Sequence, residues 1–202
     1  MIERLSANKG SHDFDHTERV YNNAVHLAKA EGADLEIVQL AALLHDICRK
    51  EEDDTNGAIN HATKGAEVAR EVLLDLDVSE DKIERICECI ARHRFRDNNA
   101  PETLEEKIIF DADKLDSIGA VGLGRSYLFS GEVGARMHNK DVDIATTAEY
   151  TKEDTAYREF LVKLSKIKDK MQTEEGRRLA EHRHQFMVVF FEEMNAEVVG
   201  ER

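Results

Sequence analysis

The sequence of 202 residues predicts an all-α protein. It contains one proline, Pro101, and many residues of high helix propensity, namely Ala, Leu, Glu, Lys and Arg. Apolar residues recur at intervals of three and four, which is typical of amphipathic helices, and no stretch alternates convincingly in the manner of a half-buried strand. An apolar fraction of 41% is sufficient for a hydrophobic core, so a wholly disordered chain is excluded.

Capping residues divide the first half of the chain into four helices. Asp13 is a suitable N-cap for a helix that stops at Gly32, and Asp34 is a suitable N-cap for the next. The third and fourth helices start after Asn60 and Ser79. The four expected helices cover about Phe14–Glu31, Leu35–Arg49, His61–Leu74 and Glu80–Arg94, with a polar loop at 51–57.

The second half contains four more expected helices. Pro101 permits a new helix just after it, and Thr173 caps the last one. Residues 131–150 contain two early glycines and many polar residues, which predicts a long loop, flexible and able to cover a site. The expected helices are Glu102–Lys114, Ser117–Phe129, Lys152–Lys170 and Glu174–Glu197, which makes about eight in all.

The charge balance and the cysteines restrict the class of protein. Lys and Arg number 28 against 42 Asp and Glu, so the formal net charge of −14 disfavours a nucleic acid partner. No apolar run approaches the ~20 residues that span a bilayer, and the N-terminus has no signal-peptide core. The three cysteines form no C-x-x-C pair and are expected to be reduced. The sequence therefore predicts a cytoplasmic protein that binds neither nucleic acid nor a membrane.

Imidazole and carboxylate side chains continue the apolar stripes of five predicted helices. In the first helix, for example, the stripe Val20, Ala24 and Leu27 has a histidine one turn earlier on the same face. A single inward histidine is usually explained by a hydrogen bond in the core. Several inward donors are costly to satisfy separately, whereas one bound cation satisfies them together. The donors are His16, His45, Asp46, His61, His93 and Asp111.

These residues give the sequence its resemblance to a known family. His16, the segment Leu43–Asp46 and Asp111 resemble the H…HD…D signature of HD-domain metal-dependent phosphohydrolases. The resemblance extends from about His12 to Gly124. Within the family, the segment Asp111–Ala120 and two C-terminal segments, 171–176 and 181–187, are similar to small bacterial and archaeal nucleotide pyrophosphohydrolases.

The resemblance implies a fold and a set of metal ligands. We expect a single HD domain over 1–202, with a metal-binding core at about 12–130, the loop at 131–150, and a C-terminal helical extension, 151–202, packed on the core. The family's four metal ligands fall on His16, His45, Asp46 and Asp111. His61 and His93 match additional histidines that complete a second metal site or bind the substrate phosphate, and both roles stay open. The mixed donors suit Mn, Fe, Co, Ni or Zn, as one ion or two.

The expected activity is hydrolysis of a small phosphorylated substrate of nucleotide type by attack of metal-activated water. Asp46 and Arg49 are the candidate catalytic residues, and Arg49 would bind phosphate or stabilise the charge of the transition state. The acidic run Glu51–Asp54 is interpreted as a solvated loop in preference to a loose Mg²⁺ site. Four basic residues are weaker candidates for substrate binding: Arg94, Arg96, Lys114 and Arg125.

Two other functions stay open at this point. Some HD-fold proteins with additional histidines are similar to di-iron oxygenases, and others would bind nucleotide and metal as sensors without turnover. The aromatic and Met residues of the last helix are spaced for core packing, with a homodimer contact as the alternative.

Overall fold

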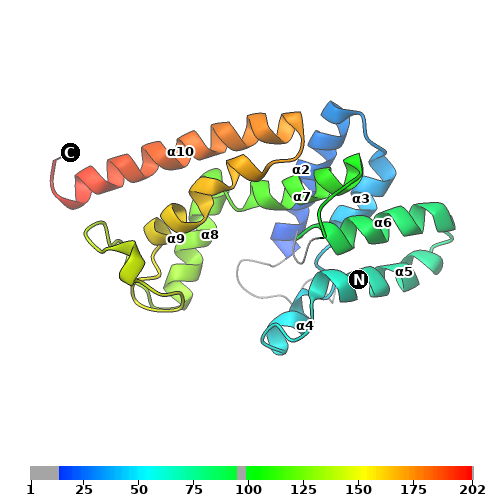
Figure 1. The fold of residues 1–202 in the computed structure, drawn as a ribbon, viewed down its shortest axis with the longest axis horizontal. Coiled ribbons are helices and arrows are strands. Elements are labelled where there is room, and N and C mark those ends of the chain that lie inside the picture. The colour runs from blue at the N-terminus through cyan, green and yellow to red at the C-terminus, as the bar shows by residue number, and fades with distance from the viewer. Residues whose placement is uncertain (1–13, 95–98, 202) are drawn as a thin grey trace. The chain divides into compact units, whose positions relative to one another are not determined.

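The structure, a computed structural model, describes residues 14–94 and 99–201, and every regular element in this part of the chain is a helix (Figure 1). The predicted all-α class is therefore confirmed. The α-helices are α2 (Phe14–Glu31), α3 (Leu35–Leu44), α4 (Arg49–Asp54), α5 (His61–Leu74), α6 (Glu80–Arg92), α7 (Leu104–Asp116), α8 (Gly119–Glu132), α9 (Ala156–Val162) and α10 (Glu174–Val198), and short 3-10 helices cover Ile144–Thr146, Leu164–Lys166 and Lys168–Lys170.

Most predicted caps hold these helices as expected. The Asp34 carboxylate accepts from the backbone of Glu36 and Ile37 at the start of α3, and the Asn60 side chain accepts from the backbone of Ala62 at the start of α5. Gly32 ends α2 with a positive φ of 78°, a conformation that favours glycine. Asp13 lies outside the described residues.

Two predicted boundaries are wrong, and both concern turns inside an apolar pattern. The helix expected to reach Arg49 ends at Leu44, and a turn over 45–48 separates it from α4, which occupies part of the predicted polar loop. The helix expected over 152–170 is reduced to α9 and two 3-10 turns, because the chain leaves helical geometry at Lys163 (φ −134°, ψ −57°). Apolar periodicity continues through such turns and does not reveal them.

The chain forms two compact units. The first comprises residues up to Asp113 together with Gln172–Gly176, and the second comprises Lys114–Met171 with Arg177–Arg202. In the first unit α5 lies against α6, α2 against α3, and α3 against α6 (Figure 1). Its core consists of fully buried aliphatic side chains from these helices, namely Val20, Leu27, Ile37, Val38, Leu73, Ile83, Ile86 and Ile90.

The second unit combines an aromatic cluster with a buried polar network. Phe191 of α10 contacts Tyr157 and Phe160 of α9. Arg158 pairs with Asp154 at 2.8 Å, and its Nε donates to Thr147 Oγ1 at 2.7 Å. Arg158 of α9 thus contacts Thr147, which lies in the segment 131–150 that we predicted as a loop.

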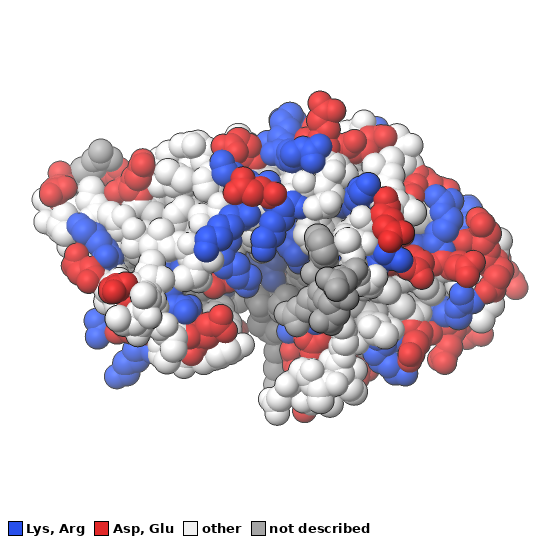
Figure 2. Space-filling view, in the orientation of Figure 1, with Lys and Arg blue, Asp and Glu red and all other residues white. Residues whose placement is uncertain are grey.

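Charged side chains of both signs lie on the surface (Figure 2). On the face shown in Figure 2, acidic and basic side chains are interspersed. Among the described residues, none of the helices combines the length and the apolar character that crossing a bilayer requires.

Candidate metal centre

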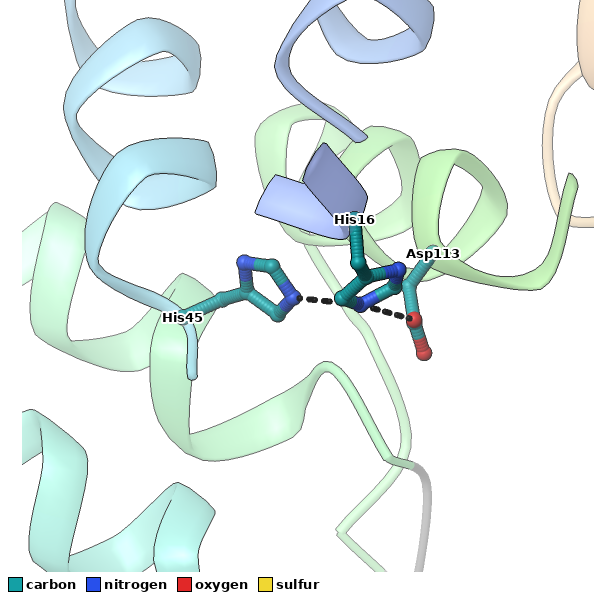
Figure 3. Close-up of side chains that lie close together, drawn as sticks. All are labelled: His16, His45 and Asp113. Carbon is teal, nitrogen blue, oxygen red and sulfur yellow. Dashed lines mark hydrogen bonds and ion pairs between the residues drawn. The ribbon is translucent and has the colours of Figure 1, made fainter. Parts of the chain in front are cut away.

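Three donor side chains from three helices form the first group of the site. His16 comes from α2, His45 from the turn after α3, and Asp113 from α7 (Figure 3). Their ligand atoms all lie within 4.8 Å of one another. Nε2 of His16 is 3.4 Å from Nε2 of His45 and 3.6 Å from Oδ1 of Asp113. Both histidines are buried.

A second group lies on the other side of Asp46. Oδ1 of Asp46 is 3.0 Å from Nε2 of His61 and 3.7 Å from Nε2 of His93. The two imidazole nitrogens are 3.2 Å apart. His61 is the first residue of α5, and His93 follows the last residue of α6. All three side chains are buried.

The Asp46 carboxylate connects the two groups. While its Oδ1 faces His61 and His93, its Oδ2 lies 3.6 Å from Nε2 of both His16 and His45. The end of α3 makes this possible, because His45 and Asp46 stand in a turn held by a hydrogen bond from Ile47 N to the Leu44 carbonyl. Adjacent residues can therefore approach the same site from different directions.

Backbone carbonyls fix the protonation pattern of two of the imidazoles. Nδ1 of His45 donates to the Ala42 carbonyl at 2.8 Å, and Nδ1 of His93 donates to the Ile90 carbonyl at 2.6 Å. Because a carbonyl oxygen only accepts, the proton of each neutral ring must be on Nδ1. The Nε2 lone pairs therefore point into the site, which is the orientation that a metal ligand requires.

These residues fit a divalent transition ion. An ion about 2.1 Å from each of two neighbouring donors separates those donors by about 3.0–3.4 Å, and the distances between donors in both groups lie at or slightly above that range. A bound cation would satisfy these buried imidazole and carboxylate groups together, whereas buried polar groups without a partner are unfavourable in a low-dielectric interior. Mixed nitrogen and oxygen donors suit Mn, Fe, Co, Ni or Zn.

The electrostatics of the site keep His93 available as a ligand. Burial, with the neighbouring His45 as the next cause, lowers the pKa of His93 to about 3. A neutral ring at pH 7 binds a cation without first releasing a proton. Burial alone would raise the pKa of Glu52, but hydrogen bonds from the His61 backbone and from Arg94 lower it to about 2.

Asp111, which we predicted as a ligand, belongs to neither group. Its carboxylate is fully buried and accepts hydrogen bonds from the backbone of Gln172 and Thr173 and from the Thr173 hydroxyl. A methyl group at Gly176 would overlap its Oδ2. Asp111 therefore anchors the start of α10, and the geometry favours Asp113, two residues later, as the ligand from α7.

Of the basic residues predicted to bind substrate, two lie beside the donor groups and two lie in the second unit. Nη1 of Arg49 is 3.4 Å from Nδ1 of His61, and Nη1 of Arg94 is 3.2 Å from the same atom. Lys114 and Arg125 belong to the second unit, where Arg125 pairs with Asp116 at 2.7 Å. Arg96 lies outside the described residues. The structure thus brings Arg49 and Arg94 to the edge of the donor groups.

One residue of the site was wrongly interpreted from the sequence as part of a solvated loop. Glu52 of α4 is buried, and its Oε2 lies 2.8 Å from Nδ1 of His61. In the sequence it stands in the acidic run Glu51–Asp54, where nothing distinguishes it from its neighbours.

Comparison with known proteins agrees with this geometry. The family model described as HD domain matches residues 13–118, which include both donor groups. The Bacillus subtilis (strain 168) protein YpgQ is 33% identical over 200 residues, covering 97% of this chain and 89% of YpgQ. The chain therefore belongs to the HD-domain family.

Solved structures show the same relationship over nearly the whole chain. The crystal structure of Bacillus subtilis YpgQ in complex with ADP has 30% identity and a TM-score of 0.76, covering 98% of this chain and 96% of that one. An HD-superfamily hydrolase from Bacillus thuringiensis has 28% identity and a TM-score of 0.76, covering 98% and 92%. The chain has the fold of HD-superfamily hydrolases and, within it, His and Asp groups suited to metal binding.

Substitution of each aspartate of α7 should show which one binds the metal and which one anchors the start of α10. Asp113→Asn removes a charged donor of the first group, so we expect metal affinity to fall at least about tenfold with little loss of stability. Asp111→Asn weakens the anchor of α10, so we expect a loss of about 1–3 kcal/mol in the free energy of unfolding with metal affinity largely retained. Titration calorimetry and urea unfolding of both variants measure these effects, and the reverse pattern would restore Asp111 as the ligand.

Acid should destabilise the metal-free chain through His93. Its folded pKa of about 3 lies below the value of 6.5 for an unperturbed histidine. Between these pH values the unfolded chain binds a proton that the folded chain does not, so this group's contribution to stability falls as pH drops from about 6.5 toward 3, by up to about 1.4 kcal/mol per pH unit. Glu52 acts in the same direction at lower pH, because its pKa of about 2 lies below the usual 4.5.

The check is urea unfolding of EDTA-treated protein between about pH 4 and pH 7. His93→Gln should show a shallower dependence of unfolding free energy on pH than the wild type. If the unfolding free energy of the variant and of the wild type depended on pH with the same slope, His93 would already be protonated in the folded chain.

Proposed function

We propose that this protein is a metal-dependent phosphohydrolase that acts on a small phosphorylated compound of nucleotide type. The observation that carries the proposal is the pair of buried donor groups that share the Asp46 carboxylate. Membership of the HD-domain family and the similarity to HD-superfamily hydrolases support it.

Each donor group would hold one divalent transition ion. His16, His45, Asp113 and Oδ2 of Asp46 would hold the first, and His61, His93 and Oδ1 of Asp46 would hold the second. Bound there, such an ion lowers the pKa of a coordinated water and polarises a phosphoryl oxygen. Neither group uses a serine or cysteine, so no covalent intermediate with the protein is required.

The chain's own residues orient the site and supply positive charge. Hydrogen bonds to the Ala42 and Ile90 carbonyls hold the His45 and His93 rings in place, which avoids a cost of reorganisation during the reaction. Arg49 and Arg94 provide guanidinium groups beside His61. Within the described residues, Nε of Arg49 is buried without a hydrogen-bond partner, and a phosphoryl oxygen can provide the missing acceptor.

The proposed substrate class rests on chemistry and on one relative. Phosphate groups match the cations of the site and the two guanidinium groups. Bacillus subtilis YpgQ, to which this chain is similar along nearly its full length, was crystallised in complex with ADP. A nucleotide is therefore the first substrate class to test here.

A di-iron oxygenase is the second candidate, and one observation favours it. The two donor groups adjoin and share a carboxylate, an arrangement equally suited to two iron ions. Anaerobic reconstitution with Fe²⁺ followed by an oxygen-uptake assay on organic substrates distinguishes the two activities. Oxygen uptake without phosphate release would favour the oxygenase.

A release assay tests the phosphohydrolase directly. Purified protein is freed of metal, loaded with Mn, Co, Ni, Fe or Mg, and incubated with nucleoside mono-, di- and triphosphates while phosphate and pyrophosphate are measured. His45→Ala and Asp46→Ala should lose both bound metal and activity, because each removes a buried donor. Normal metal binding by both variants would contradict the ligand assignment, and tight nucleotide binding without product would favour a sensor.

The variant Arg49→Ala should retain its bound metal but turn over substrate more slowly than the wild type. Removal of a guanidinium that stabilises charge on the transferred group typically slows turnover about 10²-fold or more. Steady-state kinetics with the best substrate, and metal content by elemental analysis, measure the two effects. Lys50→Ala, at an exposed lysine next to Arg49 that pairs with Asp54, is the matched control, and full activity of Arg49→Ala would remove Arg49 from the mechanism.

A further inference from the structure

The ligating side chains of the two donor groups carry little negative charge for two divalent ions. Histidines bind metal as neutral rings, so the negative charge comes from the carboxylates of Asp46 and Asp113. These two carboxylates balance one divalent ion. A second divalent ion adds two positive charges that the ligating side chains do not balance, and uncompensated charge is unfavourable in a buried site. With both ions bound, the centre therefore requires a further anion.

The second donor group is the one that an outside ligand can complete. Its donors are His61, His93 and Oδ1 of Asp46, whereas the first group has Asp113 in addition to two histidines and Oδ2 of Asp46. Three protein ligands are typical of metal sites that keep a position open for water or substrate. With one donor fewer, the second group offers an ion a weaker site than the first.

Two positive side chains stand beside this second group. Nη1 of Arg49 lies 3.4 Å from Nδ1 of His61, and Nη1 of Arg94 lies 3.2 Å from the same atom. The opposite nitrogen of the ring, Nε2, is the one that faces Asp46, at 3.0 Å. A cation on Nε2 would therefore share one imidazole ring with two guanidinium groups. Charges of the same sign this close repel each other, and more strongly in a protein interior than in water.

The carboxylates on this side are already engaged with the guanidinium groups. Glu52 accepts from Nη1 of Arg94 at 2.8 and 2.7 Å, and Asp53 accepts from Nη2 of Arg49 at 2.8 Å. Each pair is neutral as a whole, so together they provide no net negative charge for an ion. A guanidinium nevertheless has five N–H donors. Within the described residues, Nε of Arg49 is buried without a hydrogen-bond partner, which leaves a donor for an oxyanion.

We propose that the second donor group binds its ion together with a phosphate group, so that each strengthens the binding of the other. The inference rests on the proposed function for the presence of two ions, and it specifies how the same site is filled. A phosphate dianion supplies the two negative charges that the ligating carboxylates lack, and it accepts hydrogen bonds from the guanidinium groups of Arg49 and Arg94. The substrate-free protein then holds one ion firmly, and the second ion is bound when a phosphorylated substrate is bound.

A permanent centre of two ions is the alternative. In that case a hydroxide or water from the solvent completes the second site, and the affinity for both ions is the same with and without phosphate. The two cases differ in a measurable way, because coupling between two ligands is reciprocal. If phosphate strengthens the second ion by some factor, the second ion strengthens phosphate by the same factor.

The measurement is a titration of the full-length, metal-free protein with Mn²⁺, followed by the electron paramagnetic resonance signal of the free ion. One titration is made in chloride buffer and one in inorganic phosphate at equal ionic strength. A titration without protein corrects for Mn²⁺ that phosphate binds in solution. We expect one ion to bind with similar affinity in both buffers, and a second ion to bind about 5- to 150-fold more tightly in phosphate, the range usual for coupled sites.

The outcomes separate this inference from the proposed function. Two ions with affinities that phosphate does not change would overturn the inference alone, as would a single ion in both buffers. No bound Mn²⁺ in either buffer would refute the proposed function as well. His61→Asn removes a donor of the second group and should leave one ion that does not respond to phosphate. A phosphate-dependent ion that persists in this variant would overturn the assignment to the second group.

Arg49→Ala tests the role of the guanidinium groups through the sign of its effect. The variant leaves the Asp53 carboxylate without its partner, so the second ion should bind more tightly in chloride and respond less to phosphate. A purely structural role for Arg49 would weaken the ion in both buffers and would contradict the inference. Lys50→Ala removes the same charge at an exposed neighbour that pairs with Asp54, and both of its titrations should match the wild type. An equal change in Lys50→Ala would indicate a general effect of charge and would also overturn the inference.

Discussion

The first unit of this protein depends on the convergence of imidazole and carboxylate side chains in a buried space. Four imidazoles and the carboxylate of Asp46 meet with nitrogen and oxygen atoms 3.0 to 3.7 Å apart. Such a cluster of buried polar groups is costly in a low-dielectric interior unless its members are satisfied, and one cation can satisfy them together. This requirement accounts for the position of each donor at an end of its helix, where side chains from separate helices can meet.

Convergence alone would not make a site, because an imidazole can present either nitrogen. Short hydrogen bonds to the carbonyls of Ala42 and Ile90 remove this freedom for His45 and His93. Glu52 contacts the corresponding nitrogen of His61. In each case the group that orients the ring lies outside the set of donors, and the chemistry of the site depends on both layers.

Two aspartates of α7 show how one helix serves both stability and chemistry. Asp111 and Asp113 are two residues apart, which places them about 200° apart around the helix. Asp111 faces the segment Gln172–Gly176 and anchors the start of α10, whereas Asp113 faces His16. The motif Asp-Ala-Asp thus serves both the metal centre and the anchoring of the segment Gln172–Gly176 within the first unit.

The all-α class, most helix boundaries and the inward direction of the histidines could be predicted from the sequence, because caps and a repeat of 3.6 residues are local features of adjacent positions. The HD-domain family was predicted from the resemblance of His16, Leu43–Asp46 and Asp111 to its signature. Asp111 was correctly predicted to point inward, and it is fully buried. Three features could not be predicted in this way: the groups that Asp111 meets, the aspartate that lies beside His16, and the burial of Glu52 against His61. Periodicity specifies the face of a helix that is buried, whereas the partner of a buried side chain depends on how segments distant in sequence pack together.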